Sequence, residues 1–183
     1  MNRFTALAAL VFALAPYASS AQAQQPYAGF ETRSVKALSD QQVADLRAGR
    51  GMGLALAAEL NGYPGPLHVL DLSEPLQLSE AQRAKMQELF AAMKTETVPL
   101  GEKLIAEEAE LERQFAGKTI TETSLTKAMQ SIGAAQAALR AAHLKYHLTT
   151  AELLTPTQIQ RYAELRGYSS GPQTKHRHGD HKH

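Results

Sequence analysis

Four of the seven histidines in this 183-residue chain lie within its last eight residues, and they are its most direct candidates for chemistry. They are His176, His178, His181 and His183. Imidazole nitrogens bind zinc, nickel and copper, and a His-rich tract can place several of them around one ion. A purification tag would also be rich in histidine, but the interleaved Lys, Arg, Gly and Asp favour a natural metal-binding tail. Such a tail would bind loosely and unselectively, which suits scavenging or buffering of metal better than sensing.

A second candidate metal site consists of His143 and His147, which are four residues apart in a predicted helix. That spacing puts both rings on one face, so they could chelate one ion, although two ligands alone do not make a tight site. An antiparallel neighbouring helix would bring Met93 or Glu96 close enough to complete it. The alternative is structural, with a partly buried His143 packed beside Tyr146 and an exposed His147.

The rest of the composition argues against an enzyme and against a nucleic-acid binder. The chain has no Cys, so it forms no disulfide and does no thiol chemistry. Removing Arg3 with a predicted signal peptide brings the 19 basic residues level with the 18 acidic ones, whereas a nucleic-acid binder would show a basic excess. The sequence shows no nucleophile arrangement, no pair of positioned carboxylates and no phosphate loop, so we expect no catalytic residues and no organic cofactor.

Three copies of one pattern predict where helices start. Leu38–Gln42, Leu78–Gln82 and Leu154–Gln158 each read Leu, Ser or Thr, two free positions and Gln. The Ser or Thr is an N-cap that accepts a bond from the backbone N–H three residues on. The Gln reaches back to the cap's own N–H, and the Leu can staple the incoming chain to the helix. We therefore assign a structural, helix-capping role to the second and third copies, namely to Leu78, Ser79, Gln82, Leu154, Thr155 and Gln158.

The fold class that the sequence predicts is all-α. Ala, Leu, Glu, Gln and Lys dominate, and no alternating strand pattern is present. In chain order we expect a first helix that starts at Ser39 and resumes over 54–60, followed by one or two helical turns over 68–76, in which His68 has a structural role. A long helix over 79–115, kinked at Pro99, comes next. A third helix over 121–153 and a last helix over 156–167 complete the fold. The short connection at 117–120 makes the two long helices antiparallel.

The apolar spacing in the two long helices predicts their buried faces. Steps of three and four residues select Met86, Leu89, Met93, Leu100, Leu104, Leu111 and Phe115 in the first, and Leu125, Met129, Ile132, Gln136, Leu139, His143, Tyr146 and Leu153 in the second. Glu108 falls within the first stripe, so it either joins the solvated face or faces a partner or a cavity.

The N-terminal residues predict export. A positive start at Arg3, a short apolar run and the small residues of Ala21–Ala23 are typical of a signal peptide cut after Ala23, and an uncleaved anchor is the alternative. The expected segments are a signal peptide at 1–23, a flexible lead-in at 24–37, a helical domain at 38–168 and a disordered His-rich tail at 169–183.

A signal peptide, four helices with a long kinked hairpin, and the boxes at Leu78–Gln82 and Leu154–Gln158 together resemble the Spy/CpxP group of periplasmic proteins. That group includes the metal-binding relatives ZraP and CnrX, and the resemblance covers about 39–168. It implies a hooked helical hairpin that dimerises into a thin, curved cradle in the periplasm. The nickel- and cobalt-sensing branch carries a His-x3-His pair on its first helix, which this chain lacks, so that sensor site is not reproduced.

The resemblance also implies a function. The leading expectation is a periplasmic, homodimeric stress protein that binds zinc, nickel or copper in metal resistance or sensing. One alternative is an ATP-independent chaperone, a holdase for unfolding client proteins. Another is a modulator of envelope-stress signalling that contacts the periplasmic domain of a sensor kinase. Nucleic acid is a partner in none of these roles.

Overall fold

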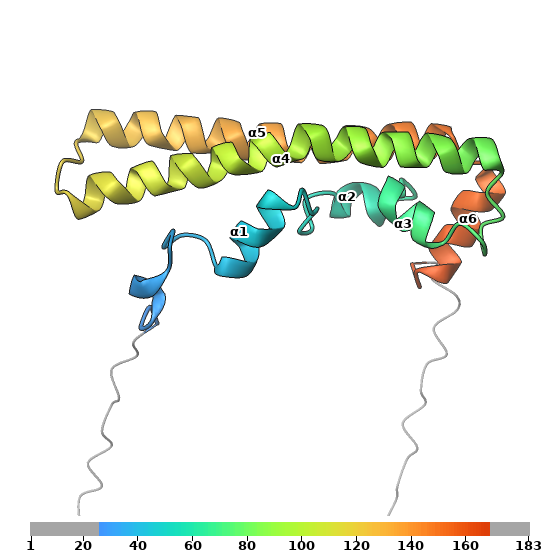
Figure 1. Ribbon diagram of the computed structural model, residues 1–183, viewed down its shortest axis with the longest axis horizontal. Helices are drawn as coiled ribbons and strands as arrows, with labels where there is room; N and C mark the ends of the chain where they lie inside the picture. Colours follow the sequence, from blue (N-terminus) through green and yellow to red (C-terminus); the bar gives the residue numbers. More distant parts are fainter. Residues whose placement is uncertain (1–25, 169–183) are drawn as a thin grey trace, which may run out of the picture.

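Two long helices organise the structure, a computed structural model that describes residues 26–168. Helices α4 (Glu80–Ala116) and α5 (Glu122–Glu152) lie side by side as an antiparallel hairpin (Figure 1). With 37 residues at 1.5 Å each, α4 spans roughly 55 Å. The described residues form helices and connecting turns without a strand, which confirms the all-α prediction.

Shorter elements lie along one side of the hairpin and across its open end (Figure 1). They are the 3₁₀ turn η1 (Phe30–Thr32), α1 (Asp40–Arg47), α2 (Leu56–Glu59), α3 (Pro66–Asp71) and, across the end, α6 (Pro156–Leu165). The predicted resumption of the first helix is thus a single turn, α2, and the turns expected over 68–76 begin earlier, because Pro66 takes the first position of α3. None of the helices in this part of the chain combines the length and the apolar character needed to cross a membrane.

Four helices begin directly after a Ser or Thr cap, three of them at the predicted boxes and the fourth at Thr121. The side-chain oxygens of Ser39, Ser79, Thr121 and Thr155 accept a hydrogen bond from the backbone N–H three residues on, at 3.1–3.2 Å. The residue at that third position, a Gln in three helices and Ser124 in α5, accepts a bond from the cap's own N–H. These reciprocal bonds satisfy backbone donors that a helix start leaves free, so each start is set locally.

The boxes that start α4 and α6 also face each other. Nε2 of Gln82 donates to Oε1 of Gln158 at 2.9 Å, and Nε2 of Gln158 donates back to Oε1 of Gln82 at 3.1 Å. Gln82 also donates to the carbonyl of Leu153 at 2.9 Å, and Gln158 to that of Leu76 at 3.3 Å. These amide bonds fasten the start of α6 onto the start of α4.

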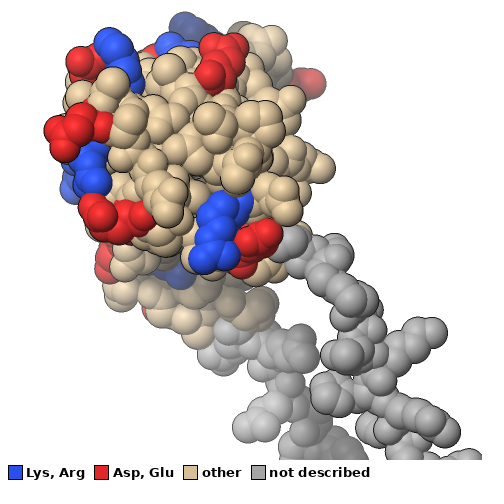
Figure 2. All heavy atoms as spheres, turned by 90° about the vertical axis from the view of Figure 1, so that its right-hand side faces the viewer, with Lys and Arg blue, Asp and Glu red and all other residues tan. Residues whose placement is uncertain are grey.

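Buried apolar residues form two cores along the hairpin. The first, where α1 packs on the two long helices, contains Val35, Val43, Leu46, Leu104, Ile105, Ile132, Ala135 and Leu139. The second, at the α6 end, contains Val69, Leu76, Leu78, Met86, Leu154 and Tyr162. The Leu of each facing box therefore belongs to one shared core. Seen from this end of the molecule, charges of both signs lie toward the edges of a face whose middle is uncharged (Figure 2).

The predicted buried stripes are correct along much of the hairpin but wrong near its turn and at Gln136, which is exposed. Met86 and Leu104 are buried as predicted, whereas Phe115 is 54% exposed and Met129 is 46% exposed. Near the turn the two long helices stand without one of the short helices packed on them (Figure 1), so large side chains there have less to cover them. Small residues take several of the buried positions of α5 instead, among them Ala128, Ala135 and Ala142.

A glycine lets α1 lie directly on α4. A Cβ at Gly101 would stand 2.6 Å from the backbone carbonyl oxygen of Leu46, which is closer than Cβ atoms come to other atoms. Leu46 itself is only 2% exposed, so this close approach helps to build the first core. Helix α4 continues through Pro99 nearby, as the apolar pattern on both sides of that residue predicted.

Candidate functional site

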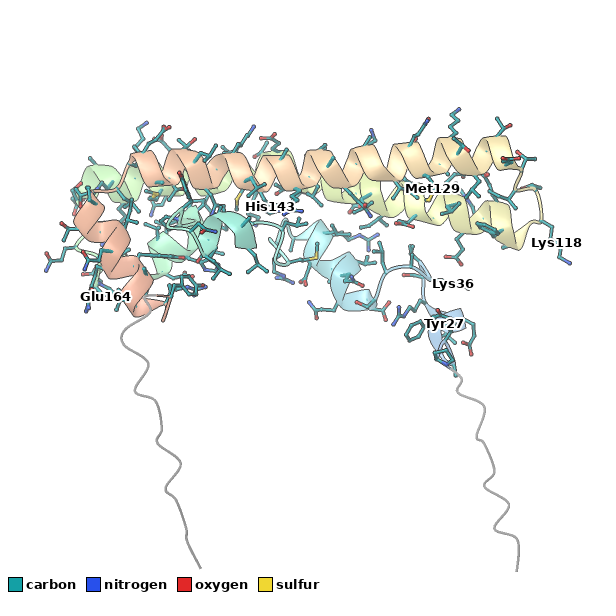
Figure 3. All side chains as sticks on the ribbon, turned by 180° about the vertical axis from the view of Figure 1, so that it is seen from behind. Tyr27, Lys36, Lys118, Met129, His143 and Glu164 are labelled. Carbon is teal, nitrogen blue, oxygen red and sulfur yellow. The ribbon has the colours of Figure 1, made fainter. Side chains whose placement is uncertain are left out.

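One pocket collects all three histidines of the described residues. It has a volume of about 410 Å³ and lies between the short N-terminal helices and the hairpin. The glycine-containing loop after α1, the start of α3, one face each of α4 and α5, and the chain that ends α6 form its wall. His68, His143 and His147 belong to that wall, and Figure 3 shows His143 on the side of α5 that faces the short helices.

His147 is held in the way that metal-binding histidines are held. The residue is 7% exposed, and its Nδ1 lies 2.7 Å from the backbone carbonyl oxygen of Tyr63. Because a carbonyl oxygen only accepts, Nδ1 donates its proton in this bond, and the tautomer that fits the contact has its lone pair on Nε2. The carboxylate of Glu59 lies 3.8 Å from the same Nδ1. A ring N–H directed at a carbonyl or carboxylate is the usual support of a histidine that ligates metal through its other nitrogen.

Gly65 lets the backbone of the turn pack closely against that other nitrogen. A Cβ at Gly65 would stand 2.9 Å from both Cε1 and Nε2 of His147, so any larger residue would press on the ring. The backbone N–H of Gly65 donates to Glu59 at 3.3 Å, which fixes the turn against the ring. The turn that precedes α3 thus packs directly on the Cε1–Nε2 edge of His147, and only a glycine fits there.

His143 lies one helical turn before His147 and is more deeply buried. It is 2% exposed, and its Nε2 has no hydrogen-bond partner among the described residues. Burial, and to a lesser extent the neighbouring His147, lowers the pKa of His143 below its usual range, so the ring is neutral near pH 7. Neutral imidazole is the form that binds metal. A buried polar atom without a partner costs about 1–3 kcal/mol, and a bound ligand would remove that cost.

Further donors at the pocket include a thioether and a third imidazole. Met93 of α4 is 7% exposed and lines the pocket together with both α5 histidines. His68 of α3 is partly exposed, with its Nδ1 3.8 Å from a carboxylate oxygen of Asp71. Imidazole and thioether favour zinc, nickel and copper over magnesium and calcium. Within residues 26–168, no three His, Cys, Asp or Glu side chains lie close enough to hold an ion by themselves.

A buried carboxylate, Glu59, connects the pocket to the C-terminal end of the fold. Its Oε1 accepts two hydrogen bonds, one from the hydroxyl of Tyr162 and one, at 3.3 Å, from the hydroxyl of Tyr168. The guanidinium of Arg166 lies 3.6 Å from the same oxygen. Burial first, and the Glu59 carboxylate second, raise the pKa of Tyr162, so its hydroxyl stays protonated and donates. No local sequence pattern singled out Glu59, because its partners come from separate elements.

The capped helices around this pocket correspond to a known family. The model of the LTXXQ motif family proteins matches residues 67–166, which is more than half of the chain. The chain belongs to the LTXXQ motif family. This is the Spy/CpxP-type family, so the resemblance seen in the two boxes is confirmed. No curated protein and no solved structure matches the chain.

In this LTXXQ protein, the helix spacing correctly placed His143 and His147 on one face, and the antiparallel hairpin brings Met93 to them. The structural alternative was wrong about His147, which is buried rather than exposed. His68 was interpreted as structural, yet it lines the same pocket. The sequence feature that could have predicted the position of His68 is Pro66, because a proline at the first position of α3 starts the helix early enough to include His68 in its first turn.

Two predicted acidic candidates lie elsewhere in the LTXXQ domain. Glu96 contacts Lys145 at 2.5 Å and accepts a hydrogen bond from Tyr146 at 3.0 Å. The bond from Lys145, and to a lesser extent that from Tyr146, lowers the pKa of Glu96. Glu108 is half-buried, and burial raises its pKa. Neither carboxylate is part of the pocket wall.

The histidines of the tail lie outside the described residues; they are His176, His178, His181 and His183. Tyr168, the last described residue, lines the pocket.

Proposed function

We propose that this LTXXQ protein is a periplasmic, non-enzymatic stress protein that binds zinc, nickel or copper in the histidine pocket. The observation that carries the proposal is the arrangement of His147. Its Nδ1 proton is directed at the Tyr63 carbonyl beside Glu59, and its Nε2 makes no hydrogen bond among the described residues. His143, one turn away with a nitrogen that lacks a partner, offers a second ligand.

The state of the two rings suits this role at neutral pH. His143 is held neutral by burial, and the carbonyl contact of His147 leaves a lone pair on its Nε2. Protons compete with metal for imidazole nitrogens, so affinity should fall as the pH is lowered toward 5. Both rings sit on a long helix within a packed hairpin, which keeps the pair together before an ion arrives.

Calorimetric titration of the mature chain, residues 24–183, with Zn²⁺, Ni²⁺ and Cu²⁺ tests the proposal. At least one of the ions should bind, and His143→Gln should weaken binding by at least about tenfold, since even the loss of a ligand's support has that effect. Met93→Leu removes the thioether at nearly constant volume and should also lower the affinity. Met129→Leu is the matched control, because Met129 is exposed near the hairpin turn (Figure 3). Failure of all three ions to bind would refute the proposal.

A second candidate function, an ATP-independent holdase, is favoured by one surface. Large apolar side chains that are 39–56% exposed gather in a single segment of the chain, and they are Met52, Leu56, Leu60, Tyr63 and Leu67. Gathered exposed apolar residues are typical of surfaces that bind other proteins.

The holdase function is tested by the aggregation of a denatured client protein in the absence of metal. The protein should suppress aggregation, and the double variant Leu56→Ser, Leu60→Ser should suppress it less. Both side chains are 56% exposed, so the fold should tolerate the change. Equal suppression by the double variant, or none by the unaltered protein, would exclude this surface as the client site.

A further inference from the structure

The histidine pocket also collects thioether sulfur. Of the four methionines in residues 26–168, Met52 and Met93 line it. Met93 is 7% exposed and yet belongs to neither of the two apolar cores, so its thioether lies at the pocket rather than within a packed core. Met52 has a φ of 43°, which residues with a side chain rarely adopt, so the glycine-containing loop holds it there against its backbone preference.

The carboxylates of the pocket wall are already paired. Oδ1 of Asp45 accepts a hydrogen bond from Nε of Arg50 at 2.6 Å. Oε1 of Glu59 accepts bonds from the hydroxyls of Tyr162 and Tyr168. Along residues 26–168, no three His, Cys, Asp or Glu side chains are grouped closely enough to bind an ion. An ion in the pocket would therefore be held by neutral donors, which are imidazole nitrogen and thioether sulfur.

Neutral donors in an apolar wall favour a singly charged, soft ion. Most residues of the wall are apolar or glycine. The free energy of moving an ion from water into such surroundings rises with the square of its charge, so a divalent ion without an anionic ligand is about four times as costly as a monovalent one. Thioether sulfur is a soft ligand that selects Cu⁺. Structural zinc sites rely instead on thiolate and imidazole, and the chain has no cysteine.

We propose that the pocket selects Cu⁺ over Zn²⁺ and Ni²⁺, with His143, His147 and the thioether of Met93 as its ligands. The proposal rests on the metal-binding function proposed above and adds the oxidation state of the metal and the residue that selects it. Met93 belongs to α4 and the two histidines to α5, so the ion would join the two long helices. The Nε2 of His143, buried without a hydrogen-bond partner, would gain one.

The test uses the full mature chain in which the four histidines after residue 175 are replaced by Gln, so that only the three pocket histidines remain. Cu⁺ is supplied without oxygen, and its affinity is measured by competition with bicinchoninate, whose Cu⁺ complex is coloured. The affinities for Zn²⁺ and Ni²⁺ are measured by calorimetry. X-ray absorption at the copper edge shows whether sulfur is bound, and because the chain has no cysteine, bound sulfur identifies a methionine.

Three variants of this chain assign the selection to one residue. Met93→Leu should remove the sulfur signal and lower the Cu⁺ affinity by at least about tenfold, and it should affect Zn²⁺ less. Met93→His replaces the soft donor by a third imidazole and should shift the preference toward Zn²⁺. Met129→Leu is the control, because Met129 is 46% exposed near the hairpin turn, and it should change neither affinity. Thermal unfolding without metal shows which variants fold, and the sulfur signal of the chain that retains Met93 needs no variant at that position.

Cu⁺ should bind at least about tenfold more tightly than Zn²⁺ or Ni²⁺, with sulfur among the neighbours of the copper. If Zn²⁺ or Ni²⁺ binds as tightly as Cu⁺, if the copper has no sulfur neighbour, or if the sulfur signal is unchanged in Met93→Leu, selection by Met93 is wrong while the metal-binding function stands. If the pocket binds none of Zn²⁺, Ni²⁺ and copper in either oxidation state, both proposals fail.

Discussion

Replacing Gly101 by alanine places a methyl group where helix α1 meets helix α4. The new Cβ would stand 2.6 Å from the carbonyl oxygen of Leu46 and 3.0 Å from its carbonyl carbon. Both are backbone atoms, so no side-chain rotation can relieve the contact. Helix α1 must move away from α4, and the first core, which includes Leu46 and Val43, must loosen.

The expected net loss of unfolding free energy is about 1–3 kcal/mol. Overpacking typically costs about 1–3 kcal/mol. Complete undocking of α1 sets the upper limit, because exposing Leu46 and Val43 costs about 1.5–3 kcal/mol for each side chain. Alanine favours a helix interior by about 1 kcal/mol over glycine, which offsets a small part of the loss. The melting temperature should fall by about 2–4 °C per kcal/mol for a chain of this length.

Gly133→Ala is the matched control in α5. A Cβ at Gly133 meets no atom within 4 Å, so the same chemical change should stabilise the protein by about 0.5–1 kcal/mol. Urea unfolding followed by circular dichroism measures both variants, and limited proteolysis between residues 36 and 50 reports whether α1 has loosened. If Gly101→Ala is as stable as Gly133→Ala and α1 is no more sensitive to protease, the close approach of the two backbones is wrong.

Three further changes test other parts of the structure. The variants Gln82→Ala and Gln158→Ala should each be less stable, and a double-mutant cycle in urea should show a coupling energy of about 0.5–3 kcal/mol, because each amide donates to the other; additive losses would mean that the amides do not interact. The lowered pKa of His143 means that the unfolded chain binds more protons than the folded one below about pH 6.5. Stability without metal should therefore decrease as the pH falls from 7 to 5, and His143→Gln should flatten that dependence; an equally steep curve for the variant would assign the effect to other groups. Finally, Tyr162→Phe removes a hydroxyl that donates to the buried carboxylate of Glu59, and it should cost about 1–3 kcal/mol of unfolding free energy at pH 7; a variant as stable as the unaltered protein would show that this bond contributes little.

The sequence predicted the helix starts well because a cap is a local feature. Ser39, Ser79, Thr121 and Thr155 each bond to a residue only three positions away, so their role can be read without knowing the fold. The same reading could not show what the capping residues face. Gln82 and Gln158 bond to each other, and nothing near either residue in the sequence reports the other.

The buried faces were predicted less well because burial depends on what lies opposite. Phe115 and Met129 have the right spacing for a buried stripe, but they lie where the hairpin has no third helix against it. Alanine is only weakly apolar, so a search for large side chains passed over positions such as Ala135, which is 1% exposed. The pair of α5 histidines followed from helical spacing alone, whereas Glu59 depends on four separate segments of the chain and has no local signature.

The hairpin turn has a consequence for the order in which the chain folds. Lys118 turns the chain with a positive φ of 53°, and α4 and α5 then pair outward from this point through contacts between neighbouring parts of the sequence. Gln82 and Gln158 are 76 positions apart, and closing so long a loop directly would carry a large entropic cost. Once the helices have paired, their far ends are already adjacent and that cost is largely removed. We therefore expect the motif for which the family is named to form late in folding. Kinetic φ-values, which compare the effect of a mutation on the folding rate with its effect on stability, should be near zero at both glutamines and higher beside the turn.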